Sequence, residues 1–115
     1  MKITTRMLRH KGACPGQVDI FKAEWPNGMD VTRESCIRAV ELGLDINWAS
    51  NTLLPPSLWG EYLSKEQLLK YEYRDKCWLI MDKDGVTEYG AEEQTLHNEY
   101  MIGIAILFAE IAAKV

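Results

Sequence analysis

The sequence predicts a mainly α-helical single domain, and three observations support this prediction. The chain has 115 residues, close to the commonest domain size and enough to form a core without a metal or disulfide. Its apolar content of 47% is typical of a globular protein and argues against a disordered tail. Helix caps and stop signals also follow one another at short intervals. We therefore expect a compact helical domain over residues 1–115.

The N-terminal third contains signals for two short helices. Thr4 or Thr5 is suited to cap the first, and Gly12 would end it. Pro15 is suited to the first turn of the second. Three apolar residues follow there at helical spacing: Val18, Phe21 and Trp25.

A turn over residues 26–28 separates these helices from the next ones. Thr32 is an N-cap for a helix that Gly43 would end, and Asp45 caps another that Pro55 and Pro56 would close. The inner face of the Thr32-capped helix is predicted to contain Cys36, Ile37, Ala39 and Val40.

The segment after the two prolines is predicted as a helical turn or two, followed by a new helix. Ser64 and Gln67 form an S-x-x-Q capping box, which indicates a helix start at Ser64. Residues 1–76 are thus expected to be a region of short helices.

The pattern changes after residue 76. Residues 77–81 (CWLIM) form a short apolar run, residues 82–85 (DKDG) indicate a turn, and residues 86–89 (VTEY) have β-type composition. These features leave open one short β-hairpin near residues 77–89, which would make the class α+β. A lone hairpin is marginal in water, so it would have to pack on the helices.

The last segment predicts a long apolar helix over residues 91–115. Between Tyr100 and Ala113 only Gly103 and Glu110 interrupt the apolar run, which is shorter than the ~20 residues that span a bilayer. We therefore expect a core helix and no membrane segment, and the N-terminus has no apolar run typical of a leader. The residues expected in the core are Ile102, Ile106 and Leu107.

This final helix is apolar on nearly every side, and a small domain usually covers only one broad stripe of a helix. One interpretation is that the uncovered side packs against a second copy to form a homodimer. The other is that the hairpin covers it in a monomer. The candidate interface residues are Ile104, Phe108, Ile111 and Val115, together with the aromatic residues Trp59 and Tyr62.

Charge is divided unevenly along the chain. Residues 1–40 carry a net charge of +3 and the remainder carries −7. A basic end could meet an acidic partner. The AVELGLD segment (residues 39–45) has helix-turn-helix-like spacing, but residues 45–54 contain no Lys or Arg to neutralise phosphates. Nucleic acid is therefore an unfavoured partner.

The candidates for chemistry are few. Cys14, Cys36 and Cys77 are odd in number and widely spaced, which indicates buried thiols and no disulfide framework. Cys14, at a helix start, is interpreted as a packing residue in preference to a nucleophile. Glu93 and His97 could share a helix face, but two ligands do not make a metal site. We expect no catalytic residues, metal or cofactor, and hence no enzyme.

One segment resembles a known group of proteins. The residues are ACPGQVDIFKAEWPNGMDVT, Ala13 to Thr32, continued by LDINWASNTLLPPSLWGEY, Leu44 to Tyr62. They are similar to a segment that recurs in small, largely uncharacterised phage and prophage proteins. Members often continue with alanine-rich repeats, whereas this chain departs with KCWLIMDKDGVTEYG.

The resemblance implies a viral accessory role in the bacterial cytoplasm and transfers no activity. We hypothesise a non-enzymatic phage-type protein that binds a host or phage protein, for example as an inhibitor of a defence system such as CRISPR. The alternative is a structural or assembly module that acts through self-association.

Overall fold

Helices make up most of this computed structural model, which describes the backbone of residues 1–84 and 89–115 and the side chains of residues 1–78 and 94–115. The elements are β1 (Lys2–Ile3), α1 (Thr5–His10), α2 (Pro15–Glu24), β2 (Met29–Asp30), α3 (Arg33–Glu41), α4 (Ile46–Leu53), α5 (Pro56–Asp84) and α6 (Tyr89–Ala112). The prediction of a mainly α domain with one short strand pair is confirmed. The strands, however, are not where the sequence suggested.

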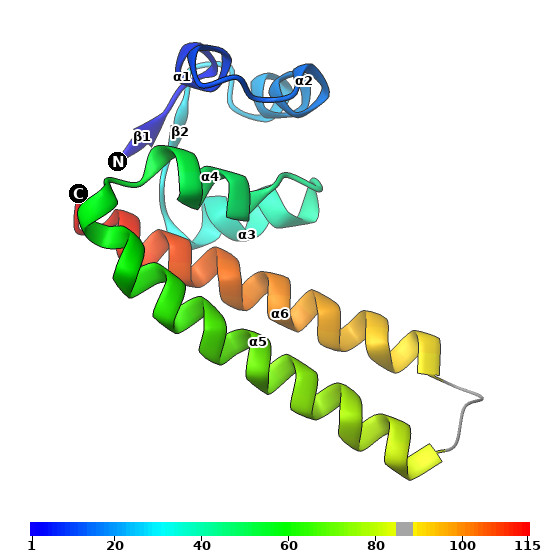
Figure 1. Ribbon diagram of the computed structural model, residues 1–115. Helices are drawn as coiled ribbons and strands as arrows, with labels where there is room; N and C mark the ends of the chain where they lie inside the picture. The colour runs from blue at the N-terminus through cyan, green and yellow to red at the C-terminus, as the bar shows by residue number, and fades with distance from the viewer. Residues whose placement is uncertain (85–88) are drawn as a thin grey trace.

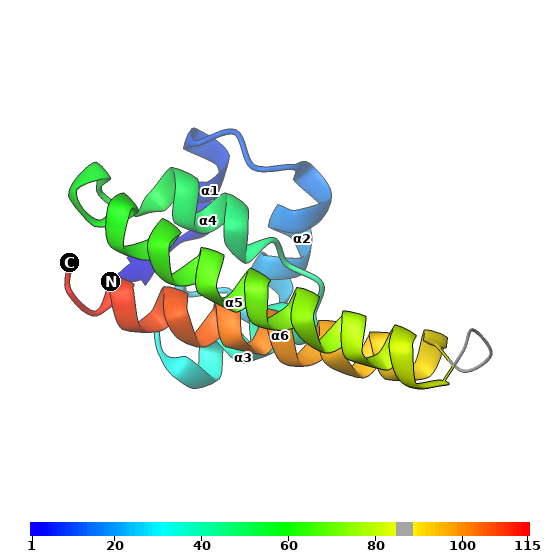
Figure 2. The ribbon, with the colours of Figure 1, turned by 60° about the horizontal axis from the view of Figure 1, so that its bottom comes forward.

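The elements form two parts: a helical part built around α6 (α3 to α6) and an N-terminal part (β1, α1, α2 and β2). Helices α5 and α6 run antiparallel as a long hairpin, and α3 and α4 lie against α6 (Figures 1 and 2). Beyond them, at the far side from α5, lie α1, α2 and the strands. β1 pairs antiparallel with β2, with Lys2 opposite Asp30 and Ile3 opposite Met29. The two termini lie near each other (Figure 1).

The predicted helix caps are confirmed where their signal is local. The Thr4 and Asp45 side chains accept hydrogen bonds from Met7 N and Trp48 N. Thr32 forms a reciprocal capping box with Ser35. Pro15 is the first residue of α2, where its missing N–H has no intrahelical partner to lose. Each cap needs only three or four neighbouring residues, so the chain specifies these helix starts locally.

Gly28 closes the turn between α2 and β2 in the left-handed region, with φ +96°. A Cβ there would lie 3.3 Å from the backbone oxygen of Ile3 and 2.8 Å from Lys2 Cε. We predict that Gly28→Ala lowers the free energy of unfolding by about 1–3 kcal/mol. Gly16→Ala is the control, because Gly16 is helical and its Cβ would meet no atom within 4 Å. Equal melting temperatures for the two variants would contradict the argument.

The C-terminal half of α6 is the centre of the core. Helices α3, α4 and α5 all contact α6, so its apolar circumference is covered from several directions. This explains how a helix apolar on nearly every side is accommodated within one chain. The buried residues of α6 are Ile104, Ala105, Leu107, Phe108, Ala109, Ile111 and Ala112.

The core prediction for α6 is partly wrong. Leu107 is buried as expected, but Ile106 is only half-buried and Ile102 is 37% exposed. Ile102 and Ile106 are four residues apart and so share one face of α6, which is covered less than the face of Ile104, Phe108 and Ile111.

The predicted strand over residues 77–81 is wrong, because Cys77–Asp84 continue α5. A run of five apolar residues fits a strand or a buried helical segment equally well, and pairing with α6 decides for helix. The other expected strand, residues 86–89, lies outside the described residues except for Tyr89, which begins α6. The predicted helix start at Ser64 is also wrong, since Ser64 is inside α5.

Candidate functional site

Four of the six candidate interface residues lie in the core. Ile104, Phe108 and Ile111 are fully buried, and Tyr62 is buried where α5 approaches α4. They were predicted as an interface because α6 is apolar all round, but α3, α4 and α5 already cover it. Trp59 and Val115 are exposed. The structure therefore does not assemble these six residues into one surface.

Tyr62 anchors α5 to α4 through its hydroxyl. Tyr62 Oη lies 3.1 Å from Asn47 Oδ1, to which it can donate a hydrogen bond. Burial raises the pKa of Tyr62 to about 12. Tyr62 is therefore a neutral, hydrogen-bonded core residue at physiological pH.

The outer face of α5 carries an exposed row of side chains that we call the α5 stripe. Its members, at positions i, i+4, i+8, i+11 and i+15, are Leu63, Gln67, Tyr71, Arg74 and Trp78. At 3.6 residues per turn they fall within about a quarter of the helix circumference and extend over about 22 Å. Tyr71 and Trp78 are 49% and 59% exposed, and Leu63 is 51% exposed.

The α5 stripe is partly ordered before any partner binds. Gln67 Nε2 donates a hydrogen bond to Tyr71 Oη at 3.0 Å, which restricts the tyrosine side chain. Single exposed apolar residues are normal, but large aromatic side chains aligned along one helix face are typical of interaction surfaces. Trp, Tyr and Arg are also the residues most enriched among binding hot spots.

The stripe was not predicted, although the spacing of its residues can be read in the sequence. The predicted helix start at Ser64 separated Leu63 from the rest, and the predicted strand at residues 77–81 removed Trp78. A single helix over residues 56–84 restores the row. Trp59, which was a candidate, lies outside it and donates its indole N–H to Leu54 O at 2.9 Å.

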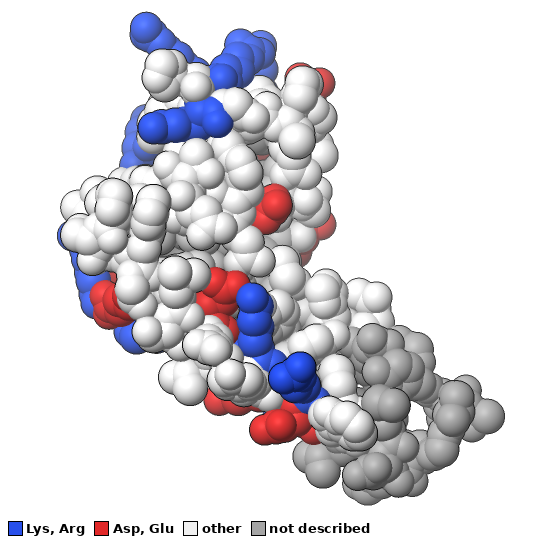
Figure 3. Space-filling model, viewed as in Figure 1, with Lys and Arg blue, Asp and Glu red and all other residues white. Residues whose placement is uncertain are grey.

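The opposite end of the molecule is basic. Lys2 on β1, Arg6 and Arg9 on α1, and Lys11 just after α1 are exposed, and basic side chains gather at that end in Figure 3. Within the described residues, none of these four is in an ion pair. The positive charge at this end can raise the rate of association with an acidic protein surface. Salt would reduce this effect by screening the charges.

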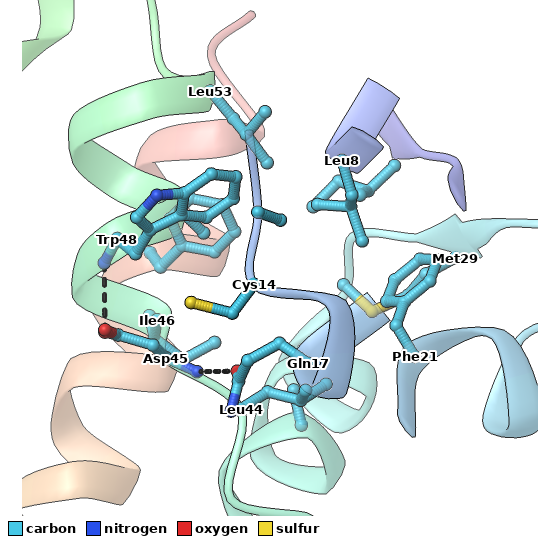
Figure 4. Close-up of a pocket in the computed structure, with 15 residues that line it drawn as sticks. Leu8, Cys14, Gln17, Phe21, Met29, Leu44, Asp45, Ile46, Trp48 and Leu53 are labelled. Atoms are coloured by element: carbon cyan, nitrogen blue, oxygen red, sulfur yellow. Dashed lines mark hydrogen bonds between the residues drawn. The ribbon is translucent and has the colours of Figure 1, made fainter. Parts of the chain in front are cut away.

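An apolar pocket of about 230 Å³ lies between the N-terminal elements and the rest of the fold. Trp48 and Leu53 of α4 face Leu8 of α1 across it, and the Cys14 side chain points toward α4 below Trp48 (Figure 4). Gln17 forms one edge, where its side-chain amide donates to Gly43 O and accepts from Asp45 N.

The three thiols are free and differ in exposure. Cys36 is buried as predicted, whereas Cys14 is exposed and Cys77 is half-buried. The prediction of buried thiols is therefore confirmed only for Cys36. Burial raises the pKa of Cys36 to about 11, so this thiol is protonated at neutral pH and is a poor nucleophile.

The raised pKa of Cys36 predicts that the protein loses stability at alkaline pH. The unfolded thiol ionises near pH 9 but the folded one near pH 11, so stability is complete below pH 9 and falls between the two values. The expected slope is about 1.4 kcal/mol per pH unit from this group. Cys36→Ala should remove that part of the slope in urea titrations at pH 8–11. Parallel pH profiles for the two proteins would contradict it.

The described side chains contain no group of three or more His, Cys, Asp or Glu residues placed to hold a metal ion. His97 is described, but the Glu93 side chain lies outside the described residues. None of the helices, over the described residues, is both long and apolar enough to cross a bilayer.

Comparison of the chain with protein-family models, with curated proteins and with solved structures found no match.

Proposed function

We propose that this chain is a non-enzymatic accessory protein of the phage type, which works by binding another protein in the cytoplasm of a bacterial host. The observation that carries the proposal is the α5 stripe, with its exposed Leu63, Tyr71 and Trp78. Burying such side chains removes a large apolar area from water. The bacterial setting comes from the resemblance of residues 13–62 to phage and prophage proteins.

The geometry of the stripe favours a partner with an apolar groove. The stripe is narrow and convex, so a flat or convex partner would touch it along little more than a line. A stable interface needs about 800 Å² per partner, which a groove can supply by wrapping both flanks of the helix. Anchors at Leu63, Tyr71 and Trp78 would then enter pockets along the groove, as in other helix-in-groove complexes.

The most specific form of the proposal is inhibition of a bacterial defence system such as CRISPR. A small protein that occupies a groove on a larger enzyme can block its action without chemistry of its own. Acceleration of the encounter by the basic end would add to this when the partner is acidic.

The test is a plating assay. The chain is expressed in a CRISPR-immune bacterium, and the efficiency of plating of a targeted phage is compared with an empty vector. We expect a rise of at least about hundredfold with the wild-type chain and with Cys14→Ser. An unchanged efficiency across the CRISPR types tested would overturn the anti-CRISPR form. Loss of activity in a folded Cys14→Ser variant would favour a cysteine-dependent enzyme.

The alternative is a structural or assembly module that acts through self-association. The same exposed stripe favours it, because a second copy could also cover Tyr71 and Trp78. Sedimentation at micromolar concentrations distinguishes the two. A monomer mass that does not change with concentration would exclude the self-association hypothesis. A dimer that Trp78→Glu converts to a folded monomer would support self-association in place of the main proposal.

A further inference from the structure

The pocket between the N-terminal elements and α4 combines a sizeable volume with an apolar wall. This pocket measures about 230 Å³. Its buried wall is almost entirely apolar and consists of Ile3, Leu8, Phe21, Met29, Ala39, Ile46, Ala49 and Phe108. Filling an apolar pocket of this kind with an apolar molecule is energetically favourable.

The polar groups at the pocket edge are already engaged within the protein. Gln17 donates one amide N–H to Gly43 O at 3.2 Å, and its side-chain oxygen accepts from Asp45 N at 3.0 Å. Asp45 Oδ1 accepts from Trp48 N at 3.0 Å as the cap of α4. The pocket therefore gains little from a polar ligand. The Asp45 carboxylate also disfavours an anionic group near this edge.

We propose that this pocket binds a small, uncharged, apolar molecule. An apolar cavity of about 150 Å³ in another protein binds benzene, so this larger pocket is suited to a molecule of about two aromatic rings or a medium-length hydrocarbon chain. Trp48 on one side and Leu8 on the other supply its contact surface (Figure 4). The inference does not depend on the proposed protein-binding function.

The occupant would connect two parts of the fold. The pocket is lined by Leu8 of α1 and Phe21 of α2 on one side and by residues of α4 and Phe108 of α6 on the other. A ligand seated there contacts both, so it should stabilise the native state in proportion to its concentration.

The test uses N-phenyl-1-naphthylamine, an uncharged aromatic probe whose fluorescence rises in apolar surroundings. We expect saturable binding of one molecule per chain and a rise in Tm with probe concentration. The probe should also slow alkylation of Cys14, which lines the pocket, at least about fivefold relative to Cys77. Unsaturable fluorescence, or equal alkylation with and without the probe, would overturn the proposal.

Two variants narrow the pocket from different positions. Ala49→Leu fills it from α4 and Ala13→Leu from the loop before α2, and the second keeps the test valid if the first does not fold. Each folded variant should weaken probe binding at least about tenfold. The double variant Tyr71→Glu/Trp78→Glu should leave binding unchanged. Loss of binding in that double variant instead would place the probe on α5 and overturn the inference.

Discussion

Phe108→Ala should lower the free energy of unfolding by about 3–5 kcal/mol and the Tm by about 12 °C or more. Phe108 is 0% exposed and lies on α6, where α3, α4 and α5 meet. Truncation removes a large apolar side chain and leaves a cavity that the surrounding helices can only partly close. Thermal melts followed by circular dichroism give the value.

The matched control for Phe108→Ala is Ile102→Ala on the same helix. Ile102 is 37% exposed, and truncating it should cost less than about 1 kcal/mol. Phe108→Glu should prevent folding, because it would bury an unpaired charge. A folded Phe108→Glu variant that merely dissociates from a dimer would show that Phe108 is at an interface, contrary to the structure.

Tyr71→Glu combined with Trp78→Glu should weaken partner binding at least about hundredfold. Hot-spot aromatic residues typically contribute 2 kcal/mol or more each when truncated, and a carboxylate also resists desolvation. Both side chains are exposed, so the change should alter stability by no more than about 1 kcal/mol. Partner binding and folding are thus separable at these positions.

The matched control is Ile20→Glu combined with Leu68→Glu. Both residues are exposed and the change in charge is the same, but Ile20 is on α2 and Leu68 lies about 100° around α5 from the middle of the stripe. This control should retain binding. Equal loss in both double variants would indicate that added negative charge alone weakens binding.

The starts of α1 to α4 could be predicted because their signals are local. Thr32 and Asp45 cap their helices through neighbours three residues away, and Pro15 fixes the first turn of α2 by its own ring. The turn at Gly28 was readable for the same reason. None of these features depends on how the helices later pack.

The candidate site could not be predicted in the same way, because burial depends on tertiary contacts. Ile104 and Phe108 were expected at an interface since no local rule says which helices cover α6. Conversely, Trp78 was not aligned with Tyr71, because the apolar run at residues 77–81 fits a strand as well as a helix and only packing against α6 decides for helix. The sequence pattern thus did not show that residues 56–84 form one continuous helix.

The most direct test of the α5 stripe is the plating assay with the two double variants at matched expression. With wild-type chain as reference, Tyr71→Glu/Trp78→Glu should return the targeted phage to the low plating efficiency of the empty vector. Ile20→Glu/Leu68→Glu should plate within about threefold of wild type, and circular dichroism should show both variants folded. Full activity of a folded Tyr71→Glu/Trp78→Glu variant would contradict the account, because the stripe could then not be the binding surface.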